Sequence, residues 1–159
     1  MESRGAAENA EVVRPLDDIT GAIVDSALKI HTALGPGLLE SVYEIVLARD
    51  LARRQFNVVR QRTVSFEYDG LRFEDAFRVD LLVDDRVIVE IKSVENVSAS
   101  HAKQLLTYLR LMKLPVGLLI NFGAPTLKEG LRRVVNNLSV SASPRLRVNQ
   151  SSLPTTQAP

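Results

Sequence analysis

Charged side chains interrupt two neighbouring apolar runs in the middle of this 159-residue chain. Asp80 interrupts the run Val79–Val83, and Glu90 and Lys92 interrupt the run that begins at Val87. Short apolar runs of this kind are typical of buried β-strands, in which Asp, Glu and Lys are rare unless they are paired. Two carboxylates and one ammonium group brought together can hold a divalent cation and activate a water molecule. This stretch therefore constrains both the fold and the chemistry.

The register of these two strands can be derived from the side-chain pattern. Residues 84–86 separate the strands, and a three-residue loop would gather the apolar side chains on one face, as the pairs Val83–Val87, Leu81–Val89 and Val79–Ile91. The same register places Asp80 opposite Glu90, and Arg78 opposite Lys92, on the other face. A two-residue loop would mix the faces. We therefore expect the three-residue loop, with the two carboxylates side by side.

The composition excludes several classes of protein. The chain has 45% hydrophobic and 25% charged residues, as soluble globular proteins do. No run approaches the roughly 18–20 apolar residues of a membrane span, and the N-terminus lacks the apolar core of a secretory signal. The absence of Cys excludes disulfides, thiolate catalysis and Cys-bound zinc. We expect a cytoplasmic protein without a membrane partner, and the net charge of +1 gives no global basic field.

Hydrophobic periodicity and turn residues predict one domain at residues 14–138. An N-terminal arm (1–13) and a Ser/Thr/Pro-rich C-terminal tail (139–159) are expected to be disordered. The predicted helices span residues 16–34, 38–55, 101–112 and 126–137. The predicted strands span 58–66, a returning segment that follows the Asp69-Gly70 turn and ends at 83, then 87–92 and 115–122. This order indicates an α/β or α+β fold, with a mixed sheet covered by helices.

Two further pairs of residues share helix faces. Glu40 and Tyr43 are three apart; read alone, Glu40 is a first-turn acid that faces the helix dipole, and Tyr43 is a core aromatic. Gln104 and Tyr108 are four apart and could be an ordinary polar pair. A Glu-x-Lys in a strand is usually a solvated stripe, although the apolar flanks argue against that interpretation here.

Taken together and in order, these motifs resemble a known family. Gly37-x-x-Glu40-x-x-Tyr43, Asp80, Glu90-x-Lys92 and Gln104-x-x-x-Tyr108, followed by the apolar strand that ends at Phe122, are similar to the GxxExxY proteins of the PD-(D/E)XK nuclease superfamily. The resemblance runs from about Leu16 to Asn137. Val79 stands where the superfamily's name has Pro, at a position that varies.

The resemblance implies a core of helix, three antiparallel strands, helix and strand. It implies that Asp80 and Glu90, with the backbone carbonyl of Ile91, bind Mg²⁺ or Mn²⁺, and that Lys92 is the catalytic lysine. Glu40 matches an acid that the first core helix adds to the site, either through water or through a second ion. Gln104 matches a helix residue that orients the lysine or the substrate, and Tyr43 would support the site. His31 is expected to be a capping or packing residue.

Two functions from different classes follow. The first is a Mg²⁺-dependent phosphodiesterase that acts on nucleic acid, with DNA as the expected substrate. The alternative is a catalytically inactive module of nuclease fold that binds nucleic acid or a protein partner. A domain of this size offers little surface for sequence-specific readout, since specific interfaces bury about 1,000 Å² or more. A homodimer would enlarge that surface.

Overall fold

The computed structural model describes residues 13–137, so the predicted N-terminal arm, apart from Val13, and the predicted C-terminal tail lie outside the described residues. The elements are α1 (Leu16–Leu34), α2 (Glu40–Arg53), β1 (Val58–Tyr68), β2 (Leu71–Val83), β3 (Val87–Lys92), α3 (Ala99–Met112), β4 (Val116–Asn121), α4 (Leu127–Gly130) and β5 (Leu131–Val135). Between residues 13 and 137, no helix has both the length and the apolar character needed to cross a membrane.

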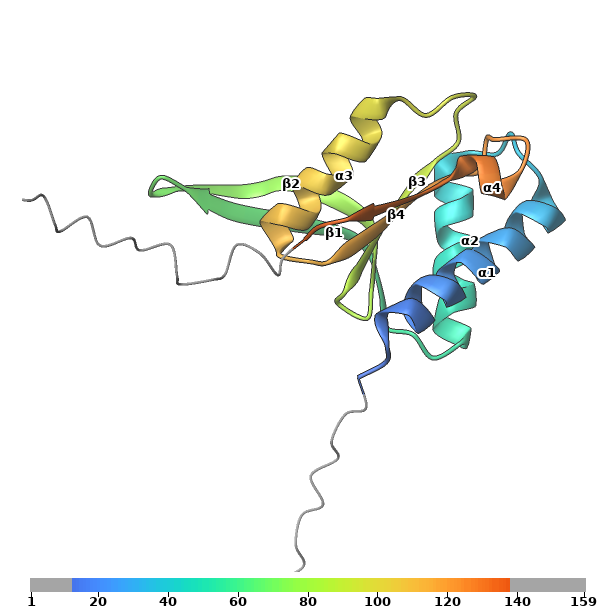
Figure 1. Cartoon of the computed structure of the whole chain (residues 1–159), viewed down its shortest axis with the longest axis horizontal. Coiled ribbons are helices and arrows are strands. Elements are labelled where there is room, and N and C mark those ends of the chain that lie inside the picture. Colours follow the sequence, from blue (N-terminus) through green and yellow to red (C-terminus); the bar gives the residue numbers. More distant parts are fainter. Residues whose placement is uncertain (1–12, 138–159) are drawn as a thin grey trace, which may run out of the picture.

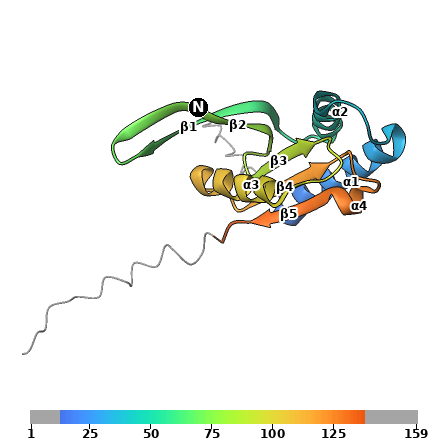
Figure 2. The ribbon, with the colours of Figure 1, turned by 90° about the horizontal axis from the view of Figure 1, so that it is seen from above.

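The strands form one mixed sheet in the order β1-β2-β3-β4-β5. The β3–β4 pair is parallel and the other neighbours are antiparallel. A parallel pair needs a crossover connection, and α3 provides it. Helices α1 and α2 lie against one face of the sheet, and α3 lies against the other (Figures 1 and 2). The predicted fold class, a mixed sheet covered by helices, is confirmed.

Each face of the sheet has its own hydrophobic core. The core under α1 and α2 combines helix residues such as Ile19, Ile23, Leu47 and Leu51 with the strand residues Leu81, Val83, Val87, Val89, Ile91, Leu118 and Ile120. The core under α3 combines Leu105 and Leu109 with Val79, Leu82, Ile88 and Leu119. Side chains of both sets alternate along β3 and β4, which explains why these strands read as continuous apolar runs.

The first helix begins and ends where its sequence predicts. Asp17 and Asp18 lie in the first turn of α1, where acids favour the positive end of the helix dipole. Gly35, at φ +70°, ends the helix in a conformation that glycine adopts without strain. The second helix is two residues shorter at each end than the predicted 38–55.

The β1–β2 hairpin is the longest feature of the sheet. Its turn consists of Asp69 (φ 50°) and Gly70 (φ 75°), and positive φ at both positions matches the predicted Asp-Gly hairpin turn. The distal half of the hairpin projects beyond the other strands as a two-stranded arm (Figures 1 and 2). The proximal half joins the sheet and carries Asp80 into it.

The predicted final helix at residues 126–137 is wrong. Thr126 caps a helix as expected, with its side chain accepting the Glu129 amide, but α4 ends at Gly130 and the chain continues as β5 along β4. A Cβ at Gly130 would lie 2.2 Å from the Asn121 carbonyl oxygen, so the chain passes too close to β4 for a longer side chain. The apolar residues at positions 131, 134 and 135 fit the spacing of a helix or of a strand. Pairing with the free edge of β4 favours the strand.

Candidate functional site

Asp80 and Glu90 lie where β2 and β3 separate. The ladder between these strands pairs Val83 with Val87, Leu82 with Ile88 and Leu81 with Val89, which is the predicted three-residue-loop register. In the described part of the chain it continues no further, so the predicted pairs Asp80–Glu90, Val79–Ile91 and Arg78–Lys92 are not formed. The acids are nevertheless in contact. The Asp80 amide donates to Glu90 Oε1 at 3.4 Å, and the Ile91 amide donates to Asp80 Oδ2 at 2.8 Å.

The predicted apolar face of the hairpin is wrong at Val79. Leu81 packs under α1 and α2 as expected, whereas Val79 packs in the core under α3. Strict alternation breaks at Asp80, which lies opposite Gln61, between the pairs Arg60–Leu81 and Arg62–Val79. Gln61 has φ +52°, outside the β region. This irregularity leaves the Asp80 carboxylate beside the Ile91 amide.

The acid pair is electrostatically unfavourable on its own. Glu90 is only 6% exposed, and burial, followed by the charge of Asp80, raises its pKa to about 8, while the charge of Lys92 opposes the shift. Within residues 13–137, neither Asp80 nor Glu90 forms a salt bridge. Two neighbouring carboxylates without a basic partner among the described residues are a donor set that a hard cation would satisfy. The residues present therefore fit Mg²⁺ or Mn²⁺.

Lys92 ends β3 and is held by the neighbouring strand. It pairs with Asn121 of β4, and its carbonyl accepts the Phe122 amide at 2.8 Å. The buried Asn121 side chain then fixes Val94, two residues later, since its Nδ2 donates to the Val94 carbonyl at 2.8 Å and its Oδ1 accepts the Val94 amide at 3.0 Å. The Lys92 side chain is partly exposed and forms no salt bridge within the described residues.

Glu40 is the first residue of α2 and approaches the end of β3. Its Oε1 accepts the Ser93 amide at 3.4 Å, and Ser93 Oγ donates to the Leu38 carbonyl at 2.5 Å. A cavity of about 670 Å³ opens here, lined by Gly37, Leu38, Leu39, Glu40, Ser41, Glu44, Gln61, Arg78, Asp80 and Ser93. Glu40 and Asp80 thus face one cavity. Among residues 13–137, however, no three acidic or histidine side chains come close enough together to form a metal-binding cluster.

Tyr43 is buried and holds the Gly-Pro-Gly loop. Its hydroxyl donates to the Gly35 carbonyl at 2.5 Å and accepts the Leu38 amide at 3.2 Å. Its ring stacks on Phe122 with centroids 4.4 Å apart. Tyr43 therefore fixes the loop that precedes Glu40, the first residue of α2. His31 is a packing residue, as expected, with Nε2 2.9 Å from the Ala124 carbonyl oxygen.

Replacing Tyr43 with phenylalanine should loosen this loop. The ring would keep its stacking on Phe122, but the Gly35 carbonyl and the Leu38 amide would lose their common partner. We expect the free energy of unfolding to fall by about 1–3 kcal/mol, the usual cost of leaving such groups unsatisfied. Urea unfolding of the variant and the parent protein measures the difference. An unchanged midpoint would show that the hydroxyl does not stabilise the loop.

The two residues of α3 that the sequence singles out, Gln104 and Tyr108, differ in their contacts. Gln104 is exposed and makes no side-chain hydrogen bond within residues 13–137. Tyr108, one turn later, stacks on Phe77 with ring centroids 4.2 Å apart. Burial raises the pKa of Tyr108, and the charges of Glu90 and Asp80 raise it further, which places this residue within their electrostatic reach. The predicted role of Gln104 stays a prediction.

Sequence reasoning missed Gln61 of β1, which contacts Asp80, and Glu44 of α2, which contacts Gln61. Glu44 is 6% exposed, accepts from Arg60 Nε at 3.0 Å and accepts from Gln61 Nε2 at 2.6 Å. One signal was available, because Glu44 lies one helical turn after Glu40 and shares its face. Nothing in the pattern indicates the backbone conformation of Gln61.

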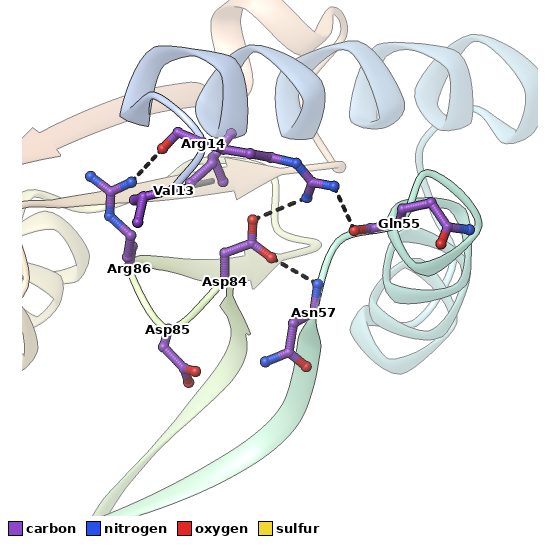
Figure 3. Close-up of a pocket in the computed structure, with 8 residues that line it drawn as sticks. Val13, Arg14, Gln55, Asn57, Asp84, Asp85 and Arg86 are labelled. Atoms are coloured by element: carbon purple, nitrogen blue, oxygen red, sulfur yellow. Dashed lines mark hydrogen bonds and ion pairs between the residues drawn. The ribbon is translucent and has the colours of Figure 1, made fainter. Parts of the chain in front are cut away.

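A second cavity, of about 460 Å³, lies at the opposite end of β3 and α2, beside the turn that joins β2 to β3 (Figure 3). The side chains of Arg14, Asp84 and Arg86 contact one another or the backbone. Arg14 pairs with Asp84 at 3.1 Å and donates to the Gln55 carbonyl at 2.8 Å, and Asp84 accepts the Asn57 amide at 2.8 Å (Figure 3). These contacts tie the start of α1 to two loops, so we assign this cavity a structural role.

Comparison with known proteins agrees with this architecture. The family model of the PD-(D/E)XK nuclease superfamily matches residues 17–134, from the first turn of α1 into β5. No curated protein matches the chain. The matched span includes the separating strands with Asp80, Glu90 and Lys92, and it covers well over half of the sequence. The chain belongs to the PD-(D/E)XK nuclease superfamily.

Proposed function

We propose that this protein is a divalent-metal-dependent nuclease that hydrolyses phosphodiester bonds of DNA. The observation that carries the proposal is the partly buried contact between the Asp80 amide and the Glu90 carboxylate, two acids that form no salt bridge within residues 13–137 and of which Glu90 lies close to Lys92 in sequence and within reach of its charge. Membership of the nuclease superfamily supports it. We further place the nuclease domain at residues 14–138 and the protein in the cytoplasm, and we assign it to the GxxExxY family.

Asp80, Glu90 and the Ile91 carbonyl would hold the Mg²⁺ or Mn²⁺ ion, with Glu40 contributing through water or a second ion. When bound, the ion supplies Lewis-acid stabilisation of phosphate charge and lowers the pKa of a coordinated water. The raised pKa of Glu90 supports this assignment, because a cation between two carboxylates offsets both the burial and the repulsion from Asp80 that raise it.

The other residues of the site fit a phosphodiester substrate. Lys92 would orient the attacking water or stabilise negative charge on the scissile phosphate. Arg78 lines the same cavity as Asp80 and Glu40, and a guanidinium group suits phosphate oxygens. Hydrolysis adds water across one P–O bond and leaves one phosphate end and one hydroxyl end. Tyr43 keeps the loop before Glu40 in place, and the exposed Gln104 would contact Lys92 or the substrate.

Cleavage of supercoiled plasmid and of single-stranded DNA tests the proposal. We expect nicking or fragmentation with Mg²⁺ or Mn²⁺ and none with excess EDTA. Asp80→Asn should lower the rate at least about 100-fold, as losses of charge-stabilising groups do. Asp69→Asn, at the exposed tip of the hairpin, is the matched control and should cleave like the parent. Equal rates for Asp80→Asn and the parent would contradict the assignment.

One observation favours the alternative of an inactive nuclease-fold module. The described residues contain no cluster of three potential metal ligands, so metal affinity would depend on two carboxylates. Titration calorimetry separates the two functions. Salt-sensitive DNA binding without detectable binding of Mg²⁺ or Mn²⁺ would support the module, whereas metal binding that is lost in Asp80→Asn would support the nuclease. A homodimer, which light scattering would detect, stays a prediction.

A further inference from the structure

Gln61 occupies a strained position directly opposite Asp80. It lies in β1 between two paired positions, yet its φ is +52°, in the left-handed region that favours glycine. Non-glycine residues adopt this conformation at an energetic cost and are concentrated at functional sites. Strain at this point coincides with the break in alternation that leaves Asp80 beside the Ile91 amide.

The side-chain amide of Gln61 is held in a fixed place. Its Nε2 donates to Glu44 Oε2 at 2.6 Å, and hydrogen bonds to a carboxylate are stronger than those between neutral groups. Glu44 is buried at 6% exposure, and its other oxygen accepts from Arg60 Nε at 3.0 Å. The amide of Gln61 is therefore anchored to α2 through a buried, paired acid.

The same amide also reaches Asp80. Gln61 Nε2 lies 3.5 Å from Asp80 Oδ1, at the long end of a hydrogen bond, while Asp80 Oδ2 accepts the Ile91 amide at 2.8 Å. Each oxygen of Asp80 thus has a donor beside it, one from each neighbouring strand. A carboxylate held at both oxygens has little freedom to turn away from Glu90.

We propose that Gln61, anchored by Glu44, is a positioning residue that sets the orientation of the Asp80 carboxylate for cation binding. This inference rests on the proposed function, because it assumes that Asp80 is a ligand. It assigns Gln61 and Glu44 a role that the resemblance to GxxExxY proteins does not imply. Arg60 takes part by neutralising Glu44, which keeps that acid from competing for the cation.

Replacing Gln61 with glycine tests the effect of the side chain separately from that of the backbone conformation. Glycine adopts positive φ freely, and this relief offsets the loss of the donor to the buried Glu44 Oε2, so the protein should still fold while the amide is lost. We expect the affinity for Mn²⁺, measured by calorimetry without DNA, to weaken by about 10- to 100-fold, as it does when groups that orient metal ligands are removed. The value of kcat should fall more than KM rises. Gln61→Asn, which also tolerates positive φ, should behave like glycine because its amide is one carbon too short to reach both acids.

Gln55→Gly is a matched control. Gln55 is also a glutamine at positive φ (+67°), it is exposed, and its backbone carbonyl rather than its side chain contacts Arg14. This variant should bind Mn²⁺ and cleave DNA like the parent. Parent-like Mn²⁺ affinity in both Gln61→Gly and Gln61→Asn would overturn the positioning role and leave the nuclease proposal standing. A parent protein that binds no Mn²⁺ would overturn the nuclease proposal, and this inference with it.

Discussion

Lys92→Ala should reduce DNA cleavage at least about 100-fold while the fold stays intact. Within residues 13–137, the hydrogen bonds of Lys92 are made by its backbone, which pairs with Asn121 and accepts the Phe122 amide. Alanine preserves these contacts. Its ammonium group forms no salt bridge within residues 13–137, so its removal leaves no buried acid newly unpaired. The loss should therefore fall on the reaction.

The measurement is the initial rate of plasmid cleavage at saturating Mg²⁺, with the melting temperature as a check on folding. Lys128→Ala, an exposed lysine of α4, is the control and should match the parent. The charge of Lys92 lowers the pKa of Glu90, so its removal should also shift the onset of metal-dependent activity to higher pH. Lys92→Arg keeps the charge and should retain that onset. If Lys92→Ala cleaves as fast as the parent, the assigned role of this lysine is wrong.

Much of the scaffold could be predicted because local signals agree with tertiary packing. The first-turn acids and Gly35 predict the bounds of α1, and Asp69-Gly70 predicts the hairpin. The β2–β3 register follows from a side-chain period of two, since a slip of one residue would expose the apolar set. These are cases in which each residue's preference and the fold's requirement coincide.

The prediction failed where a distant partner decides the local structure. Residues 131–135 carry apolar side chains at spacings that suit a helix, but the unpaired edge of β4 accepts them as a strand. Val79 changes face because the backbone departs from regular β geometry around Asp80 and Gln61. A pattern that assumes unbroken alternation cannot anticipate such a departure.

The residues of the candidate site likewise divide into those that the sequence predicts and those that only the fold brings together. Asp80, Glu90 and Lys92 could be found because charged residues inside buried strands are unusual. Glu44 and Gln61 could not be found in this way, since a glutamate in a helix and a glutamine in an exposed hairpin are ordinary in sequence. Only the folded structure brings Gln61 Nε2 within 2.6 Å of one acid and 3.5 Å of another.

Glu90→Gln should stabilise the metal-free protein at alkaline pH while it removes metal-dependent cleavage. The folded pKa of Glu90 is about 8, above its ordinary value of 4.5, so the folded state holds this proton more tightly than the unfolded state. The stability that this proton provides is complete below pH 4.5 and is lost as the pH rises through 8. Over that window the loss is on the order of 5 kcal/mol, from about 1.4 kcal/mol for each pH unit.

Glutamine has the same shape as the protonated acid, keeps an oxygen for the Asp80 amide and cannot ionise. The variant and the parent should therefore unfold alike at pH 4.5, whereas at pH 9 the variant should be the more stable by several kcal/mol. Urea unfolding in EDTA across this range measures the difference, with the exposed Glu67→Gln as a control that follows the parent. Mg²⁺ should then restore stability to the parent at pH 9, because a ligand that binds only the folded state stabilises it, and should leave Glu90→Gln unchanged. A variant that loses stability with pH as steeply as the parent would show that Glu90 is not the buried acid of this site.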